Sequence, residues 1–152
     1  MRVSDALVTS AIIAHSPCTT LRATVASLID RLVEAGRLPA HLAAGAVAIV
    51  LEREAISSTA IVEIGVSIPH ARLEGIDGLV AAIAVSPDAV YEVTAGLPIS
   101  IVALVLSSPS LTNEHLQFLS ALSLVLQSER VRNALRHAAS AADVARVVRV
   151  NE

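Results

Sequence analysis

Apolar residues in the first third of the chain recur at three- and four-residue spacing, which is typical of helices with one buried face. This spacing covers residues 21–33 and returns over residues 39–54. Residues that favour helix starts or ends lie at the boundaries of both segments: Thr19, Thr20, Gly36 and Pro39. The pattern predicts two successive helices, the second ending in the charged run at 52–54. The weaker apolar stretch before them has no signal-peptide cleavage site and is assigned to no element.

Short runs rich in β-branched residues occupy the middle of the chain. Residues 60–68, 79–86 and 99–106 are too short for helices, which predicts three strands. The second and third runs are nearly continuous in apolar character, so we expect both of their faces to be buried. One further short strand is expected near Val90–Val93, inside a loop.

Helical spacing returns after residue 114. The apolar stripe of this helix is formed by Leu119, Leu122 and Leu126, and Ser128 and Ser140 are candidate caps of two shorter helices that follow. The order of helices, strands and helices predicts an α/β layered fold with a central sheet, in one domain over residues 1–152.

Composition and charge exclude several classes of protein. Hydrophobic residues make up 54% of the chain and charged residues 16%, which excludes a disordered chain. The net charge of −3 and the 1% of aromatic residues give no nucleic-acid-binding surface. No apolar run reaches the roughly 20 residues of a membrane-spanning helix. The single cysteine, Cys18, excludes an internal disulfide, fits a reducing cytoplasm, and is expected to be a small, at least half-buried residue.

Two of the five histidines lie in settings that suggest chemistry. His70 follows an apolar run and a proline, and loops at the ends of a rigid sheet often carry functional residues. His115 lies on the apolar stripe of its helix, where a histidine is more often a hydrogen-bonded core residue. The other three are expected to be ordinary surface or half-buried side chains: His15, His41 and His137. Motifs for nucleotides, serine nucleophiles and metals are missing from the sequence, so no cofactor and no metal is predicted.

Two segments resemble a known family. "LEREAISSTAIVEIGVSIPHARLEG" (51–75) and "SPSLTNEHLQFLSALSLVLQSERVRNAL" (108–135) are similar to the enzyme IIA domains of the mannitol–fructose class of the bacterial phosphotransferase system (PTS). That class includes the nitrogen-regulatory IIA proteins. Its hallmarks are an "RE" at a helix end, a strand finishing in a "P-H" segment, and a second histidine about 45 residues later in "NEH[LI]". Arg53-Glu54, His70 and His115 match these positions in order and spacing.

This resemblance implies a fold and an activity. The fold is a central mixed β-sheet of about four to five strands flanked by helices on both faces. The activity is that of a cytoplasmic phosphotransferase component, which takes a phosphoryl group from the small carrier HPr. The group then passes to a cysteine of a IIB domain or serves as a regulatory signal. No nucleic acid and no direct membrane insertion is expected.

The resemblance also implies residue roles. His70 is the phosphoryl acceptor, and a histidine suits this role because its ordinary pKa of about 6.5 leaves much of it neutral and nucleophilic. His115 donates a hydrogen bond to the phosphoryl oxygens, and Arg53 offsets their charge. Ser58 and Thr59 add hydroxyl donors. These roles require the imidazoles of His70 and His115 to face each other across a shallow depression, within reach of one phosphate.

The sequence departs from the family between the "RE" and the "P-H" segment. Nitrogen-regulatory members read "S-T-G-I-G-x-G", whereas this chain reads "S-T-A-I-V-E-I-G", keeps only Gly65 and is one residue longer. Mannitol-type members also lack those glycines, so the subtype stays open between transport and regulation. A IIA-like interaction module that has lost phosphoryl transfer is the alternative. A small-ligand-binding domain is a more distant one.

Overall fold

A mixed β-sheet forms the centre of the computed structural model, which describes residues 2–152. Within these residues the sheet has five strands: β1 (Leu7–Ile13), β2 (Val66–Ser67), β3 (His70–Arg72), β4 (Leu79–Val85) and β7 (Ile101–Ser107). The strand order is β1-β4-β7-β2, and β3 also pairs with β7. β1 is parallel to β4, β4 is antiparallel to β7, and β2 and β3 are both parallel to β7. The mixed sheet is the one predicted.

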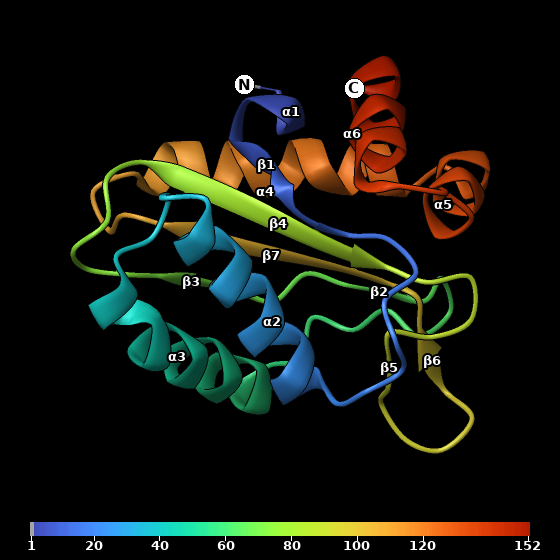
Figure 1. The fold of residues 1–152 in the computed structure, drawn as a ribbon, viewed down its shortest axis with the longest axis horizontal. Helices are drawn as coiled ribbons and strands as arrows, with labels where there is room; N and C mark the ends of the chain where they lie inside the picture. The colour runs from blue at the N-terminus through green and yellow to red at the C-terminus, as the bar shows by residue number, and fades with distance from the viewer. Residues whose placement is uncertain (1) are drawn as a thin grey trace.

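Helices cover both faces of this sheet (Figure 1). One face carries α2 (Leu21–Glu34) and α3 (Ala43–Ile56), which is preceded by the 3-10 turn η1 (Ala40–Leu42). The other face carries α1 (Val3–Ala6), α4 (Thr112–Leu126), α5 (Glu129–Arg136) and α6 (Ala141–Asn151). This layering confirms the α/β class. No helix within residues 2–152 is both long enough and apolar enough to cross a membrane.

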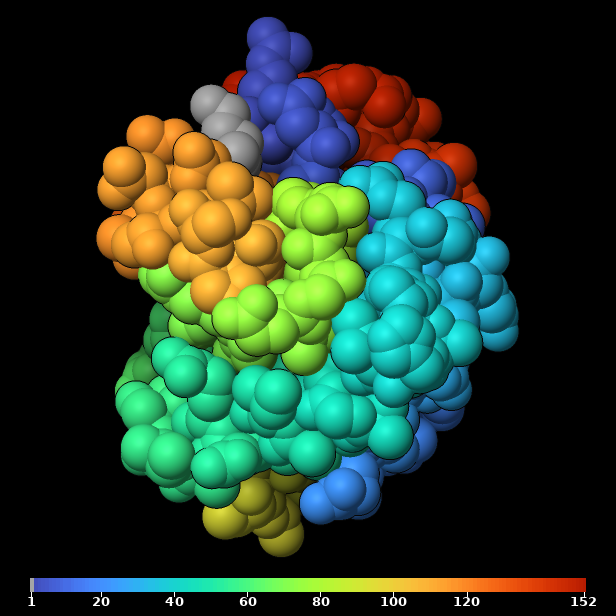
Figure 2. All heavy atoms as spheres, turned by 90° about the vertical axis from the view of Figure 1, so that its left-hand side faces the viewer, coloured from blue at the N-terminus to red at the C-terminus, as the bar shows by residue number. Residues whose placement is uncertain are grey.

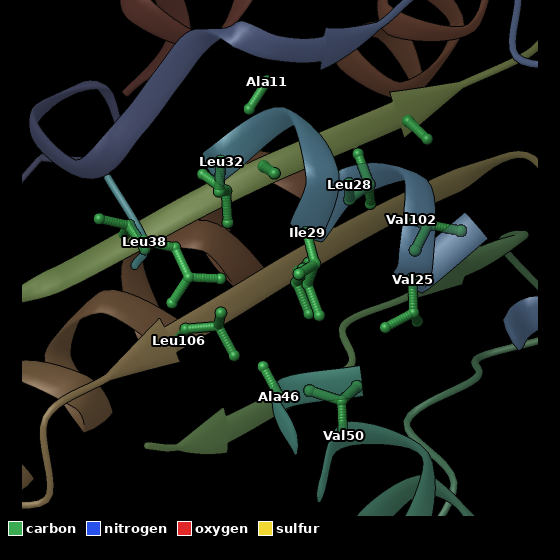
Figure 3. Packing of buried hydrophobic residues seen from close by; sticks show 14 of the residues in the cluster. Ala11, Val25, Leu28, Ile29, Leu32, Leu38, Ala46, Val50, Val102 and Leu106 are labelled. Atoms are coloured by element: carbon green, nitrogen blue, oxygen red, sulfur yellow. The ribbon is translucent and has the colours of Figure 1, made fainter. Parts of the chain in front are cut away.

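Alternation along β7 divides the buried side chains into two cores. Val102, Leu104 and Leu106 face α2 and α3, whereas the residues between them face α4 to α6. Figure 3 shows side chains of α2, among them Leu28 and Leu32, packed against the sheet. Every residue of β7 is buried, so the prediction of a strand enclosed on both faces is confirmed.

The predicted helices are confirmed, with shifted boundaries at α3 and at the start of α4. Thr20 caps α2, because its Oγ1 accepts the Ala23 N–H at 3.1 Å, and Gly36 adopts φ +72° just after the helix. Pro39 caps η1 instead of starting α3, which begins at Ala43 and continues to Ile56. The charged run at 52–54 therefore lies inside the last turns of α3. Ser128 and Ser140 cap α5 and α6 as predicted.

The strand predicted over residues 60–68 is wrong for most of its length. Only Val66–Ser67 is a strand, and the preceding residues form a tight turn. The Ile61 N–H donates to the Val66 carbonyl at 2.7 Å, which folds the segment back on itself. Gly65 makes this possible, because it adopts φ +67° and a Cβ there would lie 3.1 Å from the Ser100 Oγ.

Three further strands differ from the predictions. β1 was not predicted; its register shifts between Leu7 and Ile12, and this irregularity breaks the alternation that would have indicated a strand. β3 begins at His70, so this histidine starts a strand where it was expected to follow one. The short strand expected near Val90–Val93 is β5 (Tyr91–Glu92), which pairs with β6 (Pro98–Ile99) in a separate hairpin.

Candidate functional site

His70 is the first residue of β3 and is half-buried. Its Nδ1 lies 2.8 Å from the backbone carbonyl of Ile68. A carbonyl oxygen only accepts hydrogen bonds, so Nδ1 carries the proton and donates it. In the neutral ring the lone pair then resides on Nε2. The backbone around Pro69 thus presents His70 with one defined nitrogen available as a nucleophile.

His115 lies beside it, in the first turn of α4. The two ring centroids are 5.4 Å apart and the ring planes are inclined by 56°. His115 is only 3% exposed, and its Nδ1 lies 2.5 Å from the hydroxyl of Ser107, the last residue of β7. The structure therefore brings together two histidines that are 45 residues apart in the sequence. His115 lies beneath the surface next to His70, instead of across an open depression from it.

Burial and neighbouring positive charge keep His115 neutral. The pKa of His115 is lowered to about 4, mainly by burial and to a smaller extent by His70, Arg72 and Arg53. His115 is therefore uncharged near neutral pH. The two arginines that disfavour a proton on His115 also favour an anion at this place.

A hollow of about 360 Å³ opens next to His70, between this strand and the end of α3. Arg53, Ser57 and Thr59 line it together with His70, and so do Glu54 and the exposed Ile56. Arg53 is exposed in the last turn of α3, so its guanidinium is accessible from solvent. On the face drawn in Figure 2, atoms of α3 (teal) and of the start of α4 (orange) lie on either side of the segment after β3 (green).

The two hydroxyl residues named from the sequence have different surroundings. The Thr59 hydroxyl is hydrogen-bonded to the Glu54 carboxylate at 2.5 Å, so its proton is already engaged. The Ser58 hydroxyl accepts the Ala60 N–H at 3.2 Å, and Ser58 lines a different hollow. Ser57, which the sequence did not single out, is the serine that shares the hollow with His70.

Arg72 joins the strand of His70 to the helix of His115. Residues 70 and 72 share one side of β3, because side chains alternate along a strand. The Arg72 Nη1 donates to the Thr112 Oγ1 at 2.7 Å, and Thr112 is the first residue of α4. Neither Thr112 nor Ser107 was recognised from the sequence, because only the pairing of β3 with the end of β7 brings them to this site.

The other candidate residues lie away from His70. His15, His41 and His137 are exposed, as expected. Cys18 is also exposed, which corrects the prediction of a buried or half-buried residue. It lies in the connection between β1 and α2 and lines the same hollow as Ser58, outside the core. Among residues 2–152, no three His, Cys, Asp or Glu side chains are grouped to hold a metal ion.

Comparison with protein families matches nearly the whole chain. Residues 7–150 match the family described as "Phosphoenolpyruvate-dependent sugar phosphotransferase system, EIIA 2". The fructose-specific EIIA component of Haloferax volcanii is 32% identical over 127 residues, which are 83% of this chain and 80% of that protein. The fructose-specific EIIABC component of Bacillus subtilis is 38% identical over 92 residues, which are 60% of this chain. The match spans only 14% of that longer protein.

Solved structures share the fold. The nitrogen regulatory protein IIA-Ntr from Neisseria meningitidis superimposes with a TM-score of 0.81 at 23% identity, covering 96% of this chain and 98% of its own. The mannitol IIA enzyme of Escherichia coli, in its complex with phosphorylated mannitol IIB, gives a TM-score of 0.71 at 19% identity. That match covers 93% of this chain and 95% of the other. The family match and the curated relatives show that this chain belongs to the EIIA type 2 family of the PTS and is a phosphocarrier domain of the fructose/mannitol class.

Proposed function

We propose that His70 accepts a phosphoryl group from a phosphorylated HPr-like carrier on Nε2 and passes it to a cysteine of a IIB domain. The observation that carries this proposal is the hydrogen bond from Nδ1 to the Ile68 carbonyl, which leaves Nε2 as the nucleophile. In the step itself, a bond forms between Nε2 and phosphorus. The bond between phosphorus and the carrier breaks, and its electron pair stays on the carrier.

His115 is positioned to stabilise the transferred group. Phosphoryl transfer passes through a loose transition state with charge on the equatorial oxygens, so preorganised donors and cations supply most of the catalysis. His115 is neutral and its Nδ1 contacts the Ser107 hydroxyl. If Ser107 donates to Nδ1, the proton of His115 is on Nε2 and can be donated to a phosphoryl oxygen. With Ser107 as the donor, His115 is held in the tautomer that donates from Nε2.

Arg53 supplies positive charge from the last turn of α3. It lines the hollow next to His70, is accessible to solvent, and its charge reaches far enough to lower the pKa of His115. A guanidinium there can bind phosphoryl oxygens through two parallel hydrogen bonds. Ser57 lines the same hollow and is better placed than Ser58 to add a hydroxyl donor.

The curated relatives favour sugar transport over regulation as the destination of the group. Both are named as fructose-specific components, and one of them combines EIIA with EIIB and EIIC in a single chain. The mannitol IIA enzyme of the same fold forms a complex with a phosphorylated IIB. A transient complex of this kind needs only a small, moderately polar surface around the acceptor. We therefore propose a IIB domain of the fructose class as the downstream partner.

Phosphorylation in a reconstituted relay tests this function. The protein is incubated with phosphoenolpyruvate, enzyme I and HPr, and its phosphate is followed by intact mass and by stability to acid and alkali. We expect one acid-labile, alkali-stable phosphate that is absent from His70→Ala and retained in His41→Ala, because His41 is exposed in η1. Absence of labelling with several HPr homologues would support the alternative, an interaction module without phosphoryl transfer.

A further inference from the structure

A buried carboxylate, that of Glu54, lines the hollow next to His70 and has no part in the proposed transfer step. Glu54 is 8% exposed, and burying a charged carboxylate is costly unless donors compensate it. It also lies in the last turns of α3, where the helix dipole disfavours negative charge. Helix stability therefore does not account for a buried glutamate at this position. Residues that oppose the local structural preferences of a chain tend to occur at functional sites.

Thr59 satisfies this carboxylate with two donors. The Thr59 N–H lies 3.2 Å from each carboxylate oxygen of Glu54, and the Thr59 hydroxyl lies 2.5 Å from Oε1. An ionised carboxylate only accepts hydrogen bonds, so the hydroxyl proton of Thr59 points to Glu54. Glu54 thereby fixes the rotation of this hydroxyl and directs its lone pairs elsewhere.

Those lone pairs hold the backbone that carries His70. The Ile68 N–H donates to the Thr59 Oγ1 at 3.0 Å, and the Ile68 carbonyl accepts the proton of His70 Nδ1 at 2.8 Å. Pro69, between Ile68 and His70 in the chain, has a restricted φ. Its carbonyl accepts the Val105 N–H of β7 at 3.0 Å. A continuous series of hydrogen bonds therefore runs from Glu54 through Thr59 and Ile68 to the ring of His70.

We propose that Glu54 and Thr59 are a positioning pair for phosphoryl transfer. They hold Ile68 so that its carbonyl binds the proton of Nδ1 and directs Nε2 of His70 toward the incoming phosphorus. In this proposal Thr59 acts on His70 through Ile68, on the Nδ1 side of the ring, and does not contact the phosphoryl group. The inference rests on the proposed function for its catalytic consequence, whereas the control of the His70 tautomer can be tested without any phosphate.

Four variants separate this role from simple structural support. Thr59→Val keeps the shape of the side chain and removes the hydroxyl, Thr59→Ser restores it, and Glu54→Gln removes the charge. Thr94→Val is the matched control, because it makes the same change at an exposed threonine between β5 and β6 that does not line the hollow next to His70. Circular dichroism and thermal unfolding establish that each variant is folded.

Two readouts are taken on each folded variant. Nitrogen-15 NMR of unphosphorylated protein measures which ring nitrogen of His70 carries the proton, and the initial rate of loading from phosphorylated HPr measures transfer. We expect Thr59→Val to convert the single Nδ1–H tautomer into a mixture and to slow loading by about tenfold, since small misplacements of reacting groups are costly. Thr59→Ser should show the parental tautomer and loading rate. Glu54→Gln should give values between those of the parent and Thr59→Val, and Thr94→Val should match the parent.

A parental tautomer and loading rate in folded Thr59→Val overturn the proposal. If that variant does not fold, parental values in Glu54→Gln overturn it instead. If the parent is not loaded at all, the proposed function fails, while the tautomer measurement still decides the positioning role.

Discussion

The start of β3 and the first turn of α4 each present a histidine, and the two side chains differ in burial and in hydrogen-bond partner. His70 is half-buried and donates from Nδ1 to a carbonyl, which assigns its lone pair to Nε2. His115 is almost fully buried, contacts a hydroxyl that can donate, and has its pKa lowered to about 4. A carbonyl partner favours a nucleophile, whereas a hydroxyl partner and burial favour a neutral donor.

In the proposed mechanism, this difference keeps two identical side chains, with ring centroids 5.4 Å apart, from competing for the same phosphoryl group. One nitrogen of His70 is available to attack. His115 is buried and, with Ser107 donating to it, offers a proton instead of a lone pair. The roles are therefore set by the hydrogen-bond partners that β3 and β7 supply, and changing either partner should make the two histidines more alike.

The largest expected effect comes from removing the donor. His115→Ala should still be phosphorylated on His70, but loading from phosphorylated HPr should slow by roughly 10²–10³-fold, as for the loss of one preorganised donor to a transition-state oxygen. Initial rates under single-turnover conditions measure this loss. His41→Ala, an exposed histidine, is the control and should load at the parental rate. An unchanged rate in His115→Ala would remove His115 from the mechanism.

A smaller effect is expected on stability as a function of pH. The pKa of His115 is about 4 in the folded protein and ordinarily about 6.5 in an unfolded chain, so the unfolded chain binds a proton that the folded protein does not. The contribution of neutral His115 to the free energy of unfolding is therefore fully present above about pH 6.5 and is lost as the pH falls toward about 4. The full loss is about 3 kcal/mol in the free energy of unfolding.

Urea unfolding of the parent and of His115→Gln isolates this contribution. Both proteins share all other titrating groups, so the difference between their free energies of unfolding should change in favour of the variant as the pH is lowered. A difference that stays constant from about pH 7.5 to about pH 4 would show that His115 titrates normally, and hence that it is not buried as a neutral donor.

The fold was largely predictable because its strongest signals are local. Helical spacing and capping residues such as Thr20 and Ser140 report on neighbouring residues, and the continuous apolar run of β7 reports on burial at both faces. The pairing of His70 with His115 was predictable only through family resemblance, because no local pattern relates residues 45 positions apart.

The features that were missed depend on non-local contacts. The irregular register of β1 hides its alternation, and the turn before β2 replaces a strand because the Val66 carbonyl accepts the Ile61 N–H and Gly65 adopts a positive φ. Thr59 was assigned to the phosphoryl group because the sequence does not show that Glu54 lies within hydrogen-bonding distance of it.

The position of the phosphoryl group on His70 tests the central claim most directly. The protein is labelled with nitrogen-15 histidine and phosphorylated through enzyme I and HPr, and coupling between phosphorus and nitrogen is measured by NMR. We expect coupling to Nε2 of His70 alone, with the proton retained on Nδ1. Coupling to Nδ1 of His70, or to either nitrogen of His115, would contradict it.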